Sequence, residues 1–215
     1  MIKIRVNIDT RVGRIVQFFV LSDLILIAGW ALVEPVFSIF IKENVRGATL
    51  ITIGASAAIY WILRSLIQLP LARYLDRLGD EKKNFYVLIF GLIIASCSAV
   101  LFCFVREIWQ LYLVQTFHAI GFALYVTAWA GIFSKHLDKG NVSFEWALDN
   151  TALTIASGVS GFLGSIVAVH FGFQSVFLIA SFFSILAAAT LMLVPNLVLP
   201  RKTTAASAGI GKHLK

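Results

Sequence analysis

The stretch Pro70-Leu-Ala-Arg-Tyr-Leu-Asp-Arg-Leu-Gly-Asp-Glu-Lys-Lys83 is a short, basic connection between two long apolar segments. It contains an Asp-Arg-Leu-Gly turn that is followed by two lysines, Lys82 and Lys83. The segments on either side are nearly free of charge and longer than the roughly 20 residues that a helix needs to cross a bilayer. The stretch therefore predicts two membrane-spanning helices joined by a charged turn in water.

Working outward from this turn, the composition of the whole chain favours a membrane protein. Hydrophobic residues make up 59% of the 215 residues and charged residues only 13%. The first share is above that of a usual soluble domain and the second is about half of it. A soluble fold could not bury so much apolar surface, so lipid is the expected solvent. The apolar segments are continuous and do not alternate, which favours helices over a β-barrel.

We expect an all-α polytopic membrane protein with six transmembrane helices. Their predicted ranges are 15–41, 48–74, 85–105, 108–133, 143–169 and 173–194. The first apolar segment is too long for the core of a cleavable signal peptide. The chain thus divides into three regions, a cytoplasmic N-terminal segment over 1–14, a six-helix bundle over 15–197 and a flexible basic cytoplasmic tail over 198–215.

The distribution of Lys and Arg predicts the orientation of the bundle. Of the 18 positive residues, 14 lie in the termini and in the loop regions 73–84 and 134–142, three are Lys42, Arg46 and Arg106, and the last is Arg64 inside a span. By the positive-inside rule both termini are cytoplasmic, and the cell (inner) membrane is the expected location. The net charge of +7 forms no basic patch mixed with aromatic residues, so the expected partner is the lipid bilayer and not nucleic acid.

Charged and polar side chains inside the spans are the candidate functional residues, because such groups usually face a cavity or a partner. Asp23, Arg64 and Asp149 fall at similar depths on three helices, and we expect Arg64 to pair with Asp23, with Asp149 or with both. Such a pair either fixes helix packing or serves as a coupling or gating site whose protonation changes. The further candidates for a cavity lining or coupling site are Trp30, Glu34, Gln68, Gln115 and His118.

Some of these candidates allow two interpretations each. Glu34 either lines a cavity together with Trp30 or extends to the outer interface. His118 is either a hydrogen-bonded packing residue or a proton carrier. Three glycines in the span 143–169 share one side of the helix and predict a close approach of a neighbouring backbone; they are Gly158, Gly161 and Gly164.

No sequence pattern here is typical of an enzyme or a metal site. The chain contains no G-x-S-x-G, no H-E-x-x-H, no phosphate-binding glycine-rich loop and no Cys/His cluster. Cys97 and Cys103 lie in one span and point in different directions, so they are interpreted as packing residues. We therefore expect no enzymatic activity, no catalytic residue, no cofactor and no metal.

The six spans, the cytoplasmic termini and the turn after the second span resemble the N-terminal six-helix half of a major facilitator superfamily transporter. The family's loop reads roughly Gly-x-Leu-Ala-Asp-Arg-x-Gly-Arg-Lys. Asp76, Arg77 and Gly79 match it, whereas Ala72 replaces the first glycine and the basic pair comes late. The resemblance implies that a gating loop motif is formed by Asp76, Arg77, Gly79, Lys82 and Lys83.

Two other features of the family differ in this chain. Members often carry an arginine in the fourth helix, where Gln115 stands here, which puts arginine-dependent proton coupling in doubt. The Gly-Pro pair characteristic of antiporters is replaced by Ser160-Gly161.

A full member of the family has two six-helix halves related by a pseudo-twofold axis along the membrane normal, and this chain matches one of them. The resemblance implies transport of a small solute by alternating access, in a parallel homodimer or with another six-helix half. The first and fourth spans would line the cavity and the second and fifth would form the dimer seam. The third and sixth, nearly free of polar groups, would face lipid. The alternative is a non-transporting half, or a membrane scaffold that needs a different partner protein.

Overall fold

The computed structural model describes residues 13–193, which form six helices and, within that range, no strand. All six helices are long and apolar enough to cross a membrane, which confirms the predicted fold class. Both the predicted basic tail and the first twelve residues of the predicted N-terminal segment lie outside the described residues. The helices are α1 (Arg14–Asn44), α2 (Leu50–Leu78), α3 (Glu81–Phe102), α4 (Ile108–His136), α5 (Val142–Phe171) and α6 (Phe173–Met192).

The predicted charged turn is a tight connection between α2 and α3, and capping groups decide where these helices end. Gly79 ends α2 in the left-handed conformation, with φ of 58°, which glycine adopts without steric cost. The Asp80 carboxylate accepts hydrogen bonds from the backbone N–H groups of Lys82 and Lys83 at 3.0 and 3.4 Å. This cap begins α3 four residues earlier than the apolar run suggests.

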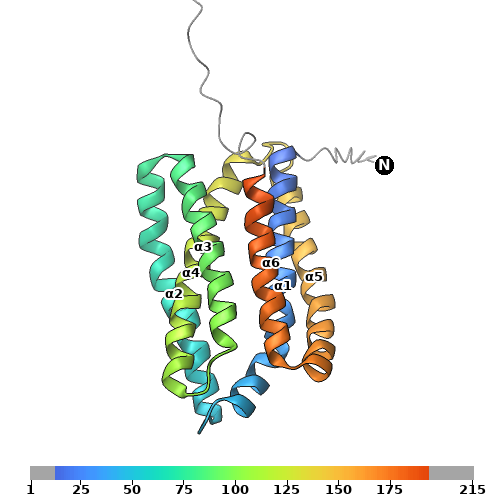
Figure 1. Ribbon diagram of the computed structural model, residues 1–215. Helices are drawn as coiled ribbons and strands as arrows, with labels where there is room; N and C mark the ends of the chain where they lie inside the picture. The colour runs from blue at the N-terminus through green and yellow to red at the C-terminus, as the bar shows by residue number, and fades with distance from the viewer. Residues whose placement is uncertain (1–12, 194–215) are drawn as a thin grey trace, which may run out of the picture.

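The helices form two groups of three (Figure 1), α2 with α4 and α3, and α5 with α1 and α6. The groups meet where α3 packs against α6. If α1 is exchanged with α4, α2 with α5 and α3 with α6, the contact of α2 with α4 becomes that of α5 with α1, and the contact of α4 with α3 becomes that of α1 with α6. The contact of α3 with α6 is unchanged. Because α1 and α4 run in opposite directions, this arrangement is that of two inverted three-helix repeats.

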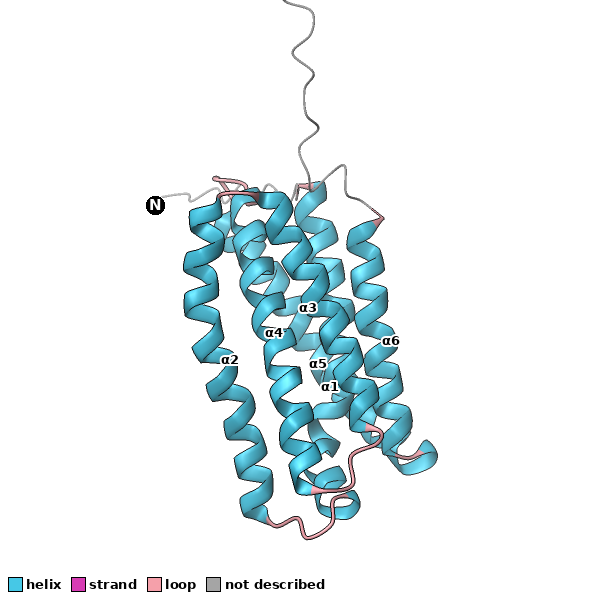
Figure 2. Cartoon of the chain, turned by 60° about the vertical axis from the view of Figure 1, so that its left-hand side comes forward, coloured by secondary structure: helices cyan, strands magenta, loops and turns pink. Residues whose placement is uncertain are grey.

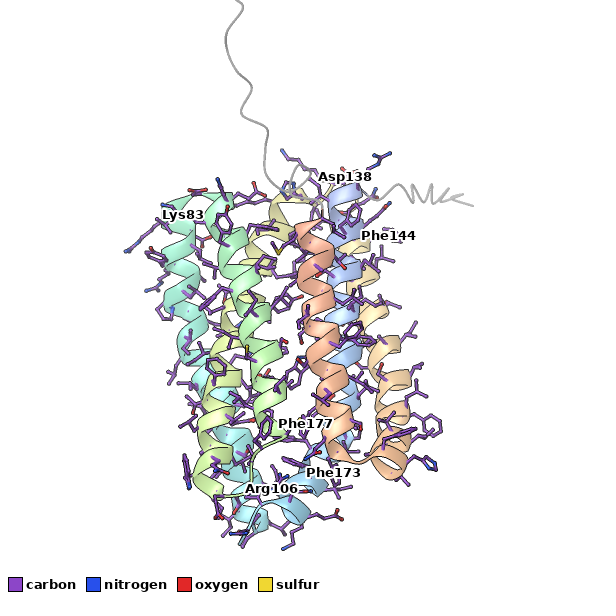
Figure 3. All side chains as sticks on the ribbon, viewed as in Figure 1. Lys83, Arg106, Asp138, Phe144, Phe173 and Phe177 are labelled. Atoms are coloured by element: carbon purple, nitrogen blue, oxygen red, sulfur yellow. The ribbon has the colours of Figure 1, made fainter. Side chains whose placement is uncertain are left out.

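The ends of the helices divide between two faces of the bundle. Lys83 and Asp138 lie at the end from which the N-terminal trace departs (Figure 3), while Arg106, Phe173 and Phe177 lie near the opposite end. The connections therefore alternate between the two ends along the chain, as expected for consecutive antiparallel spans. We refer to these two ends as the N-terminal end and the opposite end.

The apolar core consists of two clusters with a polar layer between them. The cluster nearer the N-terminal end contains Phe19, Leu88 and Ile132, and the other contains Phe40, Phe102 and Phe177. On α3, α4 and α6, buried polar residues fall between the positions that enter the two clusters, and on α1 the half-buried Trp30 lies between them. The members of this polar layer are Trp30, Ser96, Ser98, Gln115, His118, Ser181 and Ser184.

The expectation that α3 and α6 face lipid holds for one side of each helix. Each presents a row of exposed apolar side chains, such as Phe90 and Ile93 on α3 and Phe182 and Ile185 on α6. Their other sides are buried and carry the serines of the polar layer. The least covered helices are α2, which stands at the edge of the bundle in Figure 2, and α5. They pack mainly on α4 and α1 respectively.

The predicted close approach of α5 to a neighbour occurs at one of its three glycines. A Cβ atom added at Gly164 would lie 2.1 Å from the backbone oxygen of Leu32 on α1. At Gly161 the nearest atom would be 3.7 Å away, which is ordinary contact. No atom of the described chain lies within 4 Å of the Cβ position of Gly158. Of these three glycines of α5, therefore, only Gly164 needs to be glycine for packing within the described protomer.

We expect Gly164→Ala to lower the stability of the bundle by about 1–3 kcal/mol, because its methyl group would meet backbone atoms that cannot move aside. Gly158→Ala is the matched control on the same helix, and should leave stability unchanged or raise it by up to about 1 kcal/mol through helix propensity. Thermal unfolding in detergent, followed by tryptophan fluorescence, compares the two. Equal unfolding temperatures for both variants would contradict this packing of α5 on α1.

Candidate functional site

The polar layer is connected by hydrogen bonds between helices that are far apart in sequence. His118 Nδ1 of α4 lies 3.0 Å from Ser98 Oγ of α3, and both side chains are buried. Trp30 Nε1 of α1 donates to Ser184 Oγ of α6 at 3.2 Å. A third contact, 2.8 Å long, joins the hydroxyls of Ser96 and Ser181 where α3 meets α6. These bonds satisfy polar groups that water cannot reach.

Aromatic rings enclose the imidazole of His118. The ring centroids of Trp30, Phe122 and Tyr60 lie 4.1, 4.7 and 5.0 Å from that of His118. Three helices, α1, α2 and α4, thus contribute to this group. The stacking and the Ser98 contact fix the orientation of the imidazole, as the packing interpretation of His118 requires.

Arg64 extends this aromatic group toward the uncovered face of α2. Its Nη1 atom donates to the Tyr60 hydroxyl at 2.9 Å. Its guanidinium carbon lies between 5.4 and 5.9 Å from the ring centroids of Trp61, Tyr60 and Phe122, within the range of cation–π attraction. The side chain is half-buried, so part of its charge faces outward from the protomer.

The predicted ion pair of Arg64 with Asp23 or Asp149 does not form among the described residues. The two ion pairs there are Arg46 with Glu107 and His136 with Glu81. Equal depth in the membrane was the basis of the prediction, but α2 packs on α4 and has little contact with α1, while Asp149 is on α5. Tyr60 and the aromatic rings take the place of a carboxylate as partners of Arg64.

The two aspartates lie in the seam between α1, α4 and α5. The hydroxyl of Tyr125 on α4 donates to Asp23 Oδ1, and both residues are buried. Asp149 of α5 is also buried and close enough to interact electrostatically with Asp23 and Tyr125. Its Oδ1 atom has no hydrogen-bond partner among the described residues.

The remaining predicted residues are more dispersed. Glu34 is exposed on α1 and acts electrostatically on Tyr60, so it shares the uncovered face with Arg64. Gln68 is half-buried one turn from Arg64 along α2. Gln115 is buried in the polar layer, and its Oε1 atom has no hydrogen-bond partner in the described chain.

In the predicted gating loop, Asp76 and Arg77 are exposed and form no ion pair within the described residues. Gly79 ends α2, as described above. Lys82 and Lys83 are exposed, and the Lys82 ammonium group lies 5.9 Å from the ring centroid of Tyr86. The glycine of the motif thus has a structural role in this protomer, whereas its charges have none here.

Tyr125 and the four serines of the polar layer, Ser96, Ser98, Ser181 and Ser184, were missed from the sequence. Tyr125 lies seven positions after His118, on the same face of α4, so helical spacing alone could have grouped it with the polar candidates. Ser98 could not have been singled out in this way, because a serine in an apolar helix gives no sign of the residue it will contact.

The fold and the site together define an integral membrane protein of six spanning helices, with a polar layer at mid-depth and charges that face outward from the protomer. The family model described as Major Facilitator Superfamily matches residues 19–215. The chain belongs to this superfamily, and the six helices have the arrangement of its N-terminal half.

Curated proteins include a relative named an uncharacterized MFS-type transporter, from Methanocaldococcus jannaschii. It is 27% identical over 161 residues, which are 74% of this chain and 40% of that protein. The matched region is thus less than half of the relative's length. No solved structure matched the chain.

A double-mutant cycle can decide between the observed and the predicted partners of Arg64. We expect Tyr60→Phe and Arg64→Gln to be coupled by about 1 kcal/mol, because either change removes one hydrogen bond to a half-buried charge. Asp23→Asn and Arg64→Gln should be additive within about 0.5 kcal/mol. Unfolding free energies in mixed micelles supply the measurement. A larger coupling energy between Asp23 and Arg64 than between Tyr60 and Arg64 would show instead that Arg64 pairs with Asp23.

Proposed function

We propose that the protein transports a small solute across the membrane by alternating access and is not an enzyme. The observation that carries the proposal is the polar and aromatic face of α1 and α2 that no helix of the protomer covers. It contains Glu34, Trp61 and Arg64, with Tyr60 beside them. Charges on an uncovered face within a membrane span usually line a solute or ion pathway. Membership of the superfamily and the name of the curated relative support the same conclusion.

A cavity needs a second wall, and we propose that a second copy of the chain supplies it in a parallel dimer. The uncovered sides of α2 and α5 carry exposed apolar residues, among them Leu66 and Leu69 on α2 and Ile155 and Phe162 on α5. Gly158 lies on this part of α5 with open space around it, which leaves room for another backbone. A twofold axis along the membrane normal would place α2 of one copy against α5 of the other. Another six-helix half is the alternative partner.

The charges of the gating loop fit this arrangement. Asp76 and Arg77 lie exposed near the last turn of α2, at the edge where we place the second copy. In the dimer they would contact helix ends of the partner when the N-terminal end of the cavity is closed, through charge–dipole and ion-pair contacts. We place that end in the cytoplasm and the bundle in the cell membrane, because the excess of Lys and Arg lies on that side.

Cross-linking tests the dimer directly. In a background with Cys97→Ser and Cys103→Ser, we expect Leu66→Cys in one copy to cross-link with Ile155→Cys in the other. Both positions are exposed and lie about 18–20 Å from the N-terminal end, at 1.5 Å per residue. The control pair, Ile93→Cys with Leu178→Cys, is exposed on the lipid-facing sides of α3 and α6 at about 18–21 Å from the same end and should not cross-link.

Native mass spectrometry in nanodiscs gives the mass of the complex. A persistent monomer without the Leu66–Ile155 cross-link would contradict the proposed homodimer. A complex with a different six-helix protein would identify the other partner. Transport itself is tested by comparing solutes accumulated in vesicles that contain the wild type or Arg64→Gln. A solute taken up only with the wild type supports the proposal, and identical contents for wild-type, variant and empty vesicles contradict it.

A further inference from the structure

The seam between α1, α4 and α5 holds two buried carboxyl groups and few groups to balance them. Asp23 is 6% exposed and Asp149 is 4% exposed. Tyr125 donates to Asp23 Oδ1, whereas Asp149 Oδ1 has no partner among the described residues. Trp129, one turn from Tyr125 on α4, is also buried, and its Nε1–H group has no acceptor there. The proposed transport function has not used any of these groups.

No cation of the described chain is paired with these carboxyl groups. The side of α1 that carries Asp23 also meets α6, whose described residues include no titratable side chain, and there Ser22 donates to the backbone oxygen of Ala187. On α2, Arg64 is held by Tyr60, and on α4, His118 is held by Ser98. Tyr125 is the titratable group that α4 presents to the aspartates, and the nearest one on α5 is the acidic Glu145.

An isolated carboxylate buried in a membrane protein is costly, and two that face each other without a cation also repel. The Tyr125 hydroxyl favours the ionised form of Asp23, because it donates to the charged oxygen. Asp149 receives no such bond at Oδ1. One proton on the pair lowers this cost, and Asp149 Oδ1, which accepts no hydrogen bond among the described residues, is the oxygen free to take it.

A metal ion fits this site less well than a proton. Among residues 13–193, no group of three or more His, Cys, Asp or Glu side chains could hold a metal ion. A sodium ion would need several oxygen ligands around it, and the Tyr125 hydroxyl already donates its hydrogen to Asp23.

A further buried carboxyl group lies between the site and the N-terminal end of the bundle. Glu145 lies one turn before Asp149 on α5 and is 1% exposed. Its Oε2 atom accepts from the backbone N–H of Asp138 at 2.9 Å, and its Oε1 atom has no described partner. Asp138 lies at that end of the molecule (Figure 3). This is the end from which we expect a proton to enter the site.

We propose that Asp23, Tyr125 and Asp149 form a proton-binding site, in which Asp149 takes up and releases a proton from the N-terminal end of the bundle. The proton comes from water, adds to a carboxylate oxygen and returns to water, so no other reactant is needed. That this proton drives solute movement rests on the proposed function, whereas its binding does not.

Infrared difference spectroscopy tests the site without a known solute. The full-length protein in nanodiscs is titrated with acid and base while the C=O stretch of protonated carboxyl groups is followed. We expect a carboxyl band that appears and disappears with pH in the wild type and is lost in Asp149→Asn. Glu43→Gln, an exposed carboxyl near the opposite end of α1, is the matched control and should leave the band unchanged.

Tyr125→Phe provides a second readout that a purely structural pair would not give. Loss of its hydroxyl removes the donor to Asp23, so the pair should hold its proton more tightly. The midpoint of the pH titration of the carboxyl band should then move up by about one pH unit. An unchanged midpoint would contradict the site, as would a wild-type band that is absent or persists in Asp149→Asn. A midpoint that shifts when sodium replaces choline would assign the site to sodium instead. Because the spectra do not depend on dimer formation, failure here is distinguishable from failure of the proposed transporter.

Discussion

In a bilayer, every polar group that enters the hydrocarbon core has to find its partner inside the protein, and the organisation of this bundle follows from that constraint. Helices satisfy the backbone, but the serines, His118 and the Trp30 indole need partners on other helices. They find them in one layer that joins α1, α3, α4 and α6 between two apolar clusters. The polar layer thus fixes which helices meet and in what register.

Because α1, α3, α4 and α6 surround this polar layer, α2 and α5 lie at the edges of the bundle. Each of α2 and α5 packs mainly on one neighbour, and together they expose a large apolar surface. Soluble proteins avoid such faces, whereas in a membrane either lipid or another protein surface can cover them. The charges on α1 and α2 distinguish these possibilities, since Arg64 and Glu34 are unsuited to contact with lipid chains. The uncovered face therefore supports the proposal of a larger assembly in which it forms one wall.

The charges inside the membrane have separate partners. Arg64 lies among aromatic rings of α2 and α4, where cation–π contacts and the Tyr60 hydroxyl stabilise it. The aspartates lie in the seam between α1, α4 and α5, where Tyr125 donates to Asp23. Opposite charges are thus not paired with each other among the described residues. Arg64 lies beside the uncovered face of α2, and the buried carboxyl pair is the basis of the proposed proton site.

The sequence by itself determined the six spans, the charged turn at Gly79 and membership of the superfamily, because these depend on local composition and on hydrophobic length. It also identified the charged candidates, since a charge inside an apolar span stands out wherever it lies. Only the tertiary structure decided which residues contact each other, such as Arg64 with Tyr60, Asp23 with Tyr125, and Gly164 with Leu32. The depth of a residue follows from its position along a helix, but its partner depends on helix rotation and neighbour order. Those are set by packing across the whole bundle, which no single stretch of sequence encodes.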